Sequence, residues 1–359
     1  MYALKRNDFL SYVNSVTKGM KMPRLGTNEG QLALIPLPPL SEQEKIVEFL
    51  NDFENENLKE DGYYFNEKVE QKVITLHEAQ LKGSEISTEL THQLDLVKKL
   101  RQQFLQEAVQ GKLIRNEDWG LGVENTVETG AQLLDRIKAE KAKTGKKEKP
   151  LPPIKDDEIP FDIPDNWVWC RLGEVCNKIT DGFHNTPPKS KSGFPYIAAT
   201  HVKSEKIDWE NCDYVEEKYH RELFLKASPV RGEVLVVNIG AGCATPAIID
   251  VDYEFSFKNV AILKFNQQLV FNQYLYFFFL LTRPYIYKEL TKGGLQPFLS
   301  LKILNEISIP LPPLSIQAQI VSKVEELMGL CDALEAGIRV SKEVNEQLLQ
   351  QVLREALAG

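Results

Sequence analysis

Apolar residues recur every seven positions in the last part of the chain. One series with this spacing comprises Val324, Cys331, Ile338, Asn345 and Val352. A second series, three positions further on, comprises Leu327, Leu334 and Leu348. Two apolar positions in every seven residues are the pattern of a coiled coil. A shorter series with the same spacing, Leu90, Val97 and Phe104, predicts a second helix of this kind.

An ordinary amphipathic helix on a globular core is the alternative for a short segment with this pattern. The pattern continues through residues 315–359 with few helix breakers, and this length favours the coiled coil. Asn345 is a polar member of the series. We interpret it either as a residue that fixes the register of the paired helices or as part of a solvated helix end.

A nine-residue phrase occurs twice, as IPLPPLSEQ at Ile35–Gln43 and as IPLPPLSIQ at Ile309–Gln317. Its prolines fix the backbone and remove hydrogen-bond donors. Each copy is therefore expected to be extended and to lie outside helices and central strands. Ser41 and Ser315 follow the prolines, where we expect helix N-caps. In the first copy, Ser41 and Glu44 also match a capping box.

The similarity between the two copies continues beyond the phrase. QFLQEAVQG at Gln103–Gly111 resembles QVLREALAG at Gln351–Gly359, so both helical units are expected to end alike. The similarity also reaches back to a glycine and a proline that precede each copy. We therefore expect the chain to begin with only the tail of a first domain.

Short apolar runs mark the middle of the chain. PYIAAT, VLVVN, PAIID and VAILKF have the length and composition of strands. The run YLYFFFLLT at Tyr274–Thr282 is too short to span a bilayer, and it predicts a buried helix. Residues 160–306 are therefore expected to form a mixed α/β domain. The predicted fold class is α+β, with one such domain and two long helical arms.

These patterns divide the chain into six segments. They are a domain remnant ending in a proline-rich ramp (1–40), a helical arm (41–113), a connector (114–159), the mixed α/β domain (160–306), a second ramp (307–314) and a second arm (315–359). The connector ends in a basic and a proline-rich stretch, and one short helix is expected near residues 131–144. Its composition is typical of a flexible, charged linker.

The composition is that of a soluble protein with a core, since 43% of the 359 residues are hydrophobic and 26% are charged. Five cysteines without a Cys-x-x-Cys pair predict neither a disulfide framework nor a thiolate metal site, which fits a cytoplasmic location. No signal peptide or membrane segment is predicted. The net charge of −8 argues against binding nucleic acid through bulk positive charge. Residues 160–306 are nearly neutral, however, and lysines gather between Asp181 and Lys206.

The residue patterns predict no catalytic, cofactor or metal site. Asn185–Lys189 lacks the first proline and the aromatic residue of the loop with which adenine methyltransferases hold a flipped base. Gly240–Pro246 lacks the third glycine of a nucleotide-binding loop, and we interpret it as a tight turn. Glu70–Lys72 matches a nuclease site only locally. The five histidines, at positions 77, 92, 184, 201 and 220, lack the spacing of metal ligands.

Three stretches carry a family resemblance. They are IPDNWVWCRLGEVC (Ile163–Cys176), ITDGFHNTPPKSKSGFPYIAATHV (Ile179–Val202) and GGLQPFLSLKILNEISIPLPPLSIQAQIVSKVEEL (Gly293–Leu327). With them, nearly the whole chain resembles the specificity (S) subunits of type I restriction-modification systems. In that family, two target-recognition domains each read half of a bipartite DNA site, and two helical arms pack antiparallel between them. Methyltransferase (M) subunits dock on the arms, and a restriction (R) subunit is a further partner.

The resemblance implies that this chain reads double-stranded DNA through one nearly complete target-recognition domain, residues 160–306. The segment before Leu34 is too short to hold another, so we expect an S subunit shortened at its N-terminus. Its arms would pair within the chain or be exchanged with a second S chain, or a separate S fragment would supply the missing reader. The alternative is a coiled-coil assembly protein that reads no DNA, although a spacer would not need the α/β domain.

The resemblance also places the DNA-reading loops near the start of the domain and in the glycine-rich turn before its last helix. In this chain these are Thr180–Lys191 and Lys292–Gln296. The candidates for phosphate contacts are Lys189, Lys191 and Lys292. The candidates for base-edge contacts are Thr180, Asn185, Asn238 and Gln296. His184 and His201 flank the lysines and are candidates for either contact.

Overall fold

The structure is a computed structural model that describes residues 7–17, 25, 27–35, 37–54, 67–114, 128–143, 150–182, 186–204 and 206–358. The chain divides into two compact units. One comprises Met1–Ser87 and Val344–Gly359, and the other comprises Thr88–Glu343. The division falls inside both of the long helices, so each unit contains a part of each.

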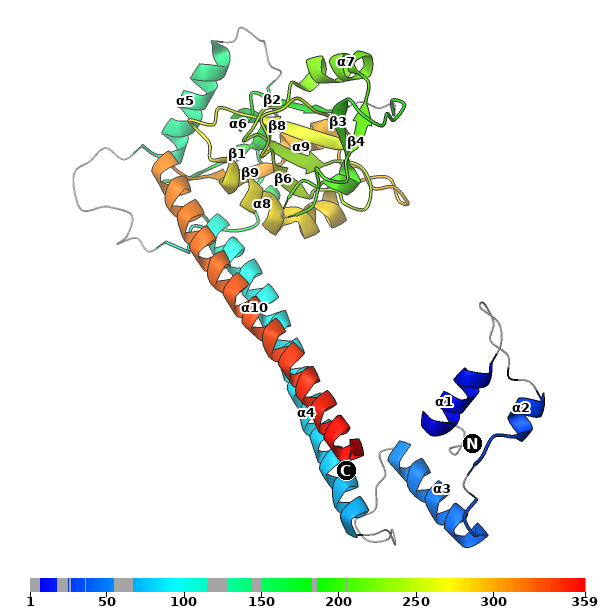
Figure 1. The fold of residues 1–359 in the computed structure, drawn as a ribbon. Coiled ribbons are helices and arrows are strands. Elements are labelled where there is room, and N and C mark those ends of the chain that lie inside the picture. The colour runs from blue at the N-terminus through cyan, green and yellow to red at the C-terminus, as the bar shows by residue number, and fades with distance from the viewer. Residues whose placement is uncertain are drawn as a thin grey trace. The chain divides into compact units, whose positions relative to one another are not determined.

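Three small sheets lie in the second unit (Figure 1). The largest has the order β2 (Lys178–Asp181), β8 (Val260–Lys264), β5 (Val234–Val237) and β6 (Pro246–Ile248), with every pair antiparallel. The second has the order β4 (Asp213–Val215), β3 (Phe194–Ala198) and β7 (Ser256–Lys258), and only β3 and β7 are parallel. The third pairs β1 (Val168–Arg171) with β9 (Ser308–Leu311) in antiparallel register.

Short helices surround these sheets. They are α5 (Gly130–Ala142), α6 (Leu172–Val175), α7 (Glu217–Ala227), α8 (Asn272–Tyr285) and α9 (Leu301–Glu306), with helical turns at Asp156–Glu158, Ala199–His201 and Ile286–Leu290. The short helix that the sequence predicts near residues 131–144 is confirmed as α5. Its N-terminus carries a capping box, in which Thr129 accepts from the backbone N–H of Gln132 and the Gln132 side chain accepts from that of Thr129.

Strand β5 separates two hydrophobic cores. Val234 and Val236 belong to one core, which includes residues of α8 such as Phe279. Leu235 and Val237 belong to the other, with aromatic residues around β7. Because successive side chains point to opposite faces and both faces are covered, β5 is a continuous apolar run rather than an alternating one.

The apolar run at Tyr274–Thr282 forms most of α8, as predicted, and Tyr274, Leu275 and Phe279 are buried. The helix packs against β5 and β6. The Tyr274 hydroxyl donates a hydrogen bond of 2.7 Å to the carbonyl oxygen of Pro310 in β9. None of the helices that the structure describes combines the length and apolar character needed to span a membrane.

Two long helices, α4 (Glu67–Val109) and α10 (Leu314–Ala358), run side by side in opposite directions (Figure 1). In the second unit, Arg101 forms an ion pair of 2.6 Å with Asp332, and Lys342 lies 3.5 Å from the Thr91 hydroxyl. A contact farther along α10 thus involves a residue nearer the start of α4, as expected for antiparallel helices. The predicted fold class is confirmed: α+β, with two helical arms that pair antiparallel within one chain.

The heptad series that the sequence predicts as the seam is only partly correct. Val97, Val324 and Cys331 are buried, and Leu90, Phe104, Leu327, Ile338, Asn345 and Val352 are half-buried. Leu334 and Leu348, however, are 52% and 56% exposed. Two apolar residues four places after members of the first series pack at the seam instead, since Met328 packs in the cluster of Leu105 and Val324 and Leu349 lies beside Gly83. Positions three and four after a seam residue flank it on opposite sides, and a single partner helix covers mainly one flank.

The N-cap prediction for Ser41 and Ser315 is wrong, because α3 (Leu40–Glu54) and α10 already begin at the preceding leucines. The glutamine of each phrase closes the turn instead. Gln43 Nε2 donates to the carbonyl oxygen of Pro38 at 2.7 Å, and Gln317 Nε2 donates to that of Pro312 at 3.0 Å. The repeated phrase thus builds the same proline-to-helix turn twice.

The remaining boundaries differ from the expected ones in two places. The first arm comprises two helices, α3 and α4, and residues 55–66 between them lie outside the described residues. The second proline-rich ramp contains β9, which pairs with β1, so the structural unit continues past the expected domain end at residue 306. Before α3, the described residues form α1 (Asn7–Val16) and α2 (Thr27–Gln31).

Candidate functional site

The loop between β2 and β3 carries Lys189 and Lys191, and we call it the lysine loop. The structure fixes it at both ends. At its start, Gly182 lies so close to Phe257 that an added Cβ would be 2.0 Å from the carbonyl oxygen of that residue. At its end, the Ser190 N–H donates a hydrogen bond of 2.8 Å to the Tyr214 carbonyl oxygen. The loop therefore presents Lys189 and Lys191 from a fixed base, and both are exposed.

Lys189 already has an acidic neighbour. Its Nζ lies 2.8 Å from Asp213 Oδ2, and 62% of the lysine side chain is exposed. An exposed pair of this kind contributes little to stability and is screened by salt, so the lysine is readily available to another anion. Earlier in the loop, the hydroxyl of Thr186 accepts a hydrogen bond from the Lys258 ammonium. His184 and Asn185 lie outside the described residues.

The glycine-rich turn forms a narrow hairpin. Lys292 and Phe298 exchange two backbone hydrogen bonds of 3.0 and 2.8 Å, and Gln296 N–H donates to the Gly293 carbonyl oxygen at 2.9 Å. Gly293 and Gly294 have φ angles of 96° and 44°, which favour glycine. Lys292 and Gln296 are exposed on this turn.

A second turn supports the hairpin. The N–H of Gly240 donates to the carbonyl oxygen of Pro297 at 2.8 Å, and the Cys243 thiol donates to the same oxygen at 3.2 Å. This confirms Gly240–Pro246 as a tight turn between β5 and β6. Burial raises the pKa of the Cys243 thiol to about 11, which keeps it protonated near neutral pH.

Two of the predicted base-contacting residues are buried. Thr180 lies in β2 opposite Ile262 and is 6% exposed. Asn238 is 5% exposed, and its backbone joins both turns, because its carbonyl oxygen accepts from the Leu299 N–H at 2.7 Å. Its side-chain oxygen has no hydrogen-bond partner among the described residues. In this arrangement the two residues support the loops rather than stand on the surface.

His201 is half-buried and has a local role. Its Nδ1 accepts a hydrogen bond of 2.9 Å from the N–H of Ala198, which closes the helical turn after β3. Seven of the nine predicted DNA-contacting residues are described, and four of these seven are exposed, namely Lys189, Lys191, Lys292 and Gln296. They lie on two turns that belong to the same unit.

A buried histidine, a buried serine and a half-exposed glutamate are arranged in the order of a hydrolytic triad. His220 Nδ1 lies 2.9 Å from Ser256 Oγ, and His220 Nε2 lies 3.1 Å from Glu254 Oε2. Ser256 is only 2% exposed and His220 is fully buried, stacked on Phe194 at 3.9 Å. A substrate has no access to this serine, so the cluster holds α7 against β7.

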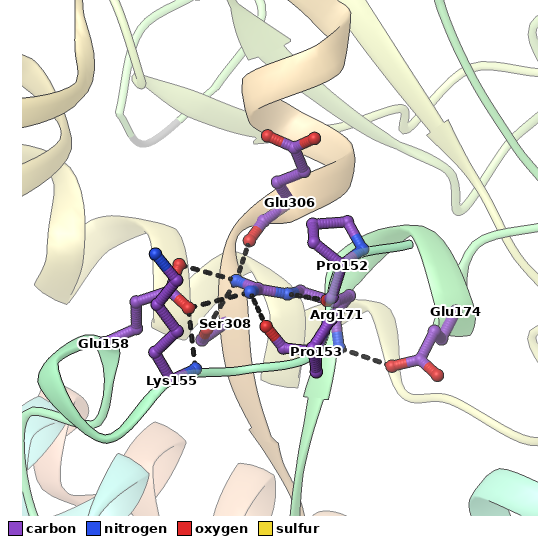
Figure 2. Close-up of polar contacts among 8 residues, drawn as sticks. All are labelled: Pro152, Pro153, Lys155, Glu158, Arg171, Glu174, Glu306 and Ser308. Atoms are coloured by element: carbon purple, nitrogen blue, oxygen red, sulfur yellow. Dashed lines mark hydrogen bonds and ion pairs between the residues drawn. The ribbon is translucent and has the colours of Figure 1, made fainter. Parts of the chain in front are cut away.

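Arg171 organises the junction between the connector and the sheets, and no sequence motif indicated it (Figure 2). The arginine is 3% exposed and lies at the end of β1. Its Nε and Nη2 donate to the carbonyl oxygens of Pro152 and Pro153 at 3.0 and 2.8 Å. It thereby ties the proline-rich end of the connector to the domain.

The remaining donors of Arg171 reach the last residue of α9, the first residue of β9 and a carboxylate. Nη1 donates to the carbonyl oxygen of Glu306 at 2.5 Å and to Ser308 Oγ at 3.0 Å. Glu158 accepts from both Nη atoms, at 3.1 and 2.8 Å. The hydrogen bonds from Arg171 and from the Lys155 N–H lower the pKa of Glu158. The guanidinium is therefore fully used within the fold.

A shallow aromatic hollow of about 450 Å³ lies beside the lysine loop. It is lined by Phe194, Pro195, Trp209, Cys212, Tyr214, Tyr253 and Glu254. The carboxylate of Glu254 in its lining disfavours a phosphate there. Among the described residues, no group of three or more His, Cys, Asp and Glu residues is placed to hold a metal ion.

Comparison with known proteins shows the family to which the chain belongs. Residues 2–62 and 164–344, more than half of the chain, match the model of the type I restriction modification DNA specificity domain. The chain belongs to this family. The match to this specificity domain covers the two exposed turns and most of α10, and it includes both copies of the repeated phrase.

Relatives of this specificity-domain chain include two subunits from Escherichia coli. The chain is 28% identical over 345 residues to the type I restriction enzyme EcoAI specificity subunit and 27% identical over 356 residues to the EcoEI specificity subunit. The matches cover 88% and 90% of this chain but only 56% and 58% of those relatives. The chain thus spans little more than half the length of either.

The fold is also shared with a solved structure. A chain from a type I R-M system, studied for its complex assembly and conformational transition, superposes with a TM-score of 0.52 at 19% identity. The superposition covers 99% of this specificity-domain chain and 69% of the other. At this identity the likeness shows the fold alone.

Proposed function

We propose that this chain is the DNA-reading, non-catalytic subunit of a type I restriction-modification assembly. The family match carries the proposal, since the matched relatives are specificity subunits of type I restriction enzymes. The sheet domain is the reader of one half-site of a bipartite target, and methylation requires a separate methyltransferase subunit. No cofactor is assigned to the chain itself.

The four exposed residues on the two turns form the proposed contact surface. Lys189, Lys191 and Lys292 meet phosphates, which supply affinity without sequence information. Gln296 reads a base edge, because its amide can pair with adenine in the major groove. Thr180 and Asn238 support the loops in this proposal. His184 and Asn185 remain candidates in the part of the loop that the structure does not describe.

The paired helices provide the scaffold. Helix α10 has 45 residues, and at ~1.5 Å per residue it reaches roughly 67 Å, nearly two turns of duplex at ~34–36 Å each. We infer that methyltransferase subunits bind these arms and that a restriction subunit joins through them. A second copy or a separate specificity fragment is the source of a second half-site reader. The cytoplasm is the proposed location, since all five cysteines are free.

Expression of the chain with its methyltransferase subunit in cells that lack other DNA methylation tests the proposal. Sequencing of modified bases should reveal methylation at one motif, and gel-shift assays should show preference of the purified complex for it. The chain alone should neither bind S-adenosylmethionine nor methylate DNA. A complex that assembles but shows no sequence preference would instead support the scaffold without DNA reading.

A further inference from the structure

Leu295 stands at the tip of the glycine-rich hairpin, fully in solvent. Its exposure is 108% of the reference value, the highest among the large hydrophobic residues that the structure describes. A single exposed apolar residue is ordinary on a protein surface. Leu295 differs because the backbone around it is constrained to hold it away from the protein.

The constraint begins with the two glycines before the leucine. Gly294 has a φ of 44°, and an added Cβ there would have no neighbour within 4 Å, so the turn is exposed on this side as well. Gly293 has a φ of 96°, and an added Cβ would lie 2.7 Å from the Gln296 carbonyl oxygen. Only glycine allows so tight a turn without strain.

The base of the hairpin is equally fixed. Phe298 pairs with Lys292 across the hairpin and with Ile239 in the adjacent turn. The Pro297 carbonyl oxygen accepts from Gly240 and Cys243 of that turn. Leu295 is thus presented by an anchored turn, which limits the ordering entropy that a partner must overcome when it binds.

The neighbours of Leu295 suit DNA. Lys292 and Gln296 are exposed on the same turn, and they supply a phosphate donor and an amide. In the major groove, an adenine offers N6 and N7 to a glutamine amide, while its paired thymine offers a C5-methyl group to an apolar side chain. Adjacent glutamine and leucine side chains therefore match the adenine edge and the thymine methyl group that a site rich in A·T pairs presents in the major groove.

We propose that Leu295 is a specificity-determining residue that packs against the C5-methyl group of a thymine in the major groove, beside the base edge that Gln296 contacts. This inference rests on the proposed function, because it requires that the sheet domain reads DNA. It adds an apolar contact to a set of recognition residues that was otherwise polar.

Replacement of thymine by deoxyuridine tests the contact, because it removes only the methyl group. The complete complex of the chain with its methyltransferase subunit is titrated with duplexes that carry one such replacement at each thymine of the recognised half-site. We expect one position at which loss of the methyl weakens binding by about fourfold, as for burial of one methyl-sized group. In Leu295→Ala, the same replacement should change binding little.

Leu225→Ala is the matched control, because Leu225 on α7 is 79% exposed and undergoes the same truncation. It should keep the full response to deoxyuridine. Equal responses of the wild type and Leu295→Ala at every thymine would overturn the inference. Loss of methyltransferase-subunit binding by Leu295→Ala would also overturn it. So would a rise in the fluorescence of 2-aminopurine placed in the duplex, which reports an unstacked base, if that rise depends on Leu295 but not on any thymine methyl group.

The failure of the proposed function is distinguishable from the failure of this inference. If the wild-type complex prefers no DNA sequence, the reading function itself is wrong. The other outcome is that the wild-type complex prefers one sequence while the effects of Leu295→Ala and of each deoxyuridine replacement on the binding free energy simply add. In that case only the role of Leu295 is wrong.

Discussion

The side-chain amide of Asn345 donates a hydrogen bond of 2.9 Å to the backbone carbonyl oxygen of Gly83 on the facing helix. Gly83 is buried, and an added Cβ would lie 3.5 Å from Leu349. A polar residue in the apolar series thus reaches across the seam. This contact favours the first interpretation of Asn345, as a residue that fixes register, over a solvated helix end.

Replacement of this residue should separate stability from register. In Asn345→Leu the apolar contact grows and the hydrogen bond is lost, so we expect an unchanged or higher unfolding midpoint together with species larger than one chain. The wild type should scatter light as a 40.9 kDa monomer. Gln350→Leu changes an exposed position and is the control. A strictly monomeric Asn345→Leu with a lower midpoint would contradict the register role.

The two glutamines of the repeated phrase should differ in their effect on stability. Gln317 is fully buried, donates to Pro312 and accepts from the Phe271 N–H at 3.0 Å. Gln317→Ala leaves buried groups unpaired, and we expect a loss of about 2–3 kcal/mol in urea unfolding. Gln43→Ala should cost about 1 kcal/mol or less, because Gln43 is only half-buried. Equal losses would show that the turn, rather than burial, sets the cost.

Arg171 should be among the most sensitive positions. Arg171→Met removes a buried guanidinium and with it the donors to the carbonyl groups of Pro152, Pro153 and Glu306, and we expect about 3 kcal/mol lower stability in urea unfolding followed by tryptophan fluorescence. Arg231→Met is the matched control, since its pair with Asp252 is exposed, and it should cost less than about 1 kcal/mol. A similar, small loss in both variants would refute the role of Arg171 as the anchor of the connector.

The Glu158 contact predicts an acid-dependent contribution to stability. Because the folded-state pKa of Glu158 lies below its ordinary value of 4.5, its contribution is present above pH 4.5 and is lost as pH falls through the folded-state pKa. The stability difference between the wild type and Glu158→Gln should thus be constant above about pH 5.5 and shrink in acid. A difference that grows on acidification would reverse the predicted sign.

The exposed lysines should set the salt dependence of DNA binding. Lys189→Ala combined with Lys191→Ala should weaken binding to all sequences alike and reduce the slope of log affinity against log salt by roughly 1.8, at ~0.9 per phosphate contact. Lys143→Ala with Lys323→Ala removes the same charge from two exposed helical ion pairs and should leave the slope unchanged. If both double variants behave alike, the DNA contacts lie elsewhere.

The sequence by itself determined the elements whose cause is local. Heptad spacing predicted the long helices, prolines predicted extended ramps, and the apolar run at Tyr274–Thr282 predicted the buried α8. Each depends on backbone sterics or on a side-chain period within one element. The turn Gly240–Pro246 was also predicted from its own residues, whereas the turn Lys292–Gln296 was located only through the family resemblance.

The tertiary structure alone decided which faces are covered. Leu334 is exposed although it fits the heptad, because α10 turns another flank toward α4. Thr180 is polar and was predicted to begin a loop, and Asn238 is polar and precedes a predicted turn, yet neighbouring strands and turns bury both. Arg171 gathers acceptors from distant segments, and Leu295 remains in solvent because the hairpin anchors hold it outward. These properties depend on contacts between residues far apart in the chain, and no local pattern encodes them.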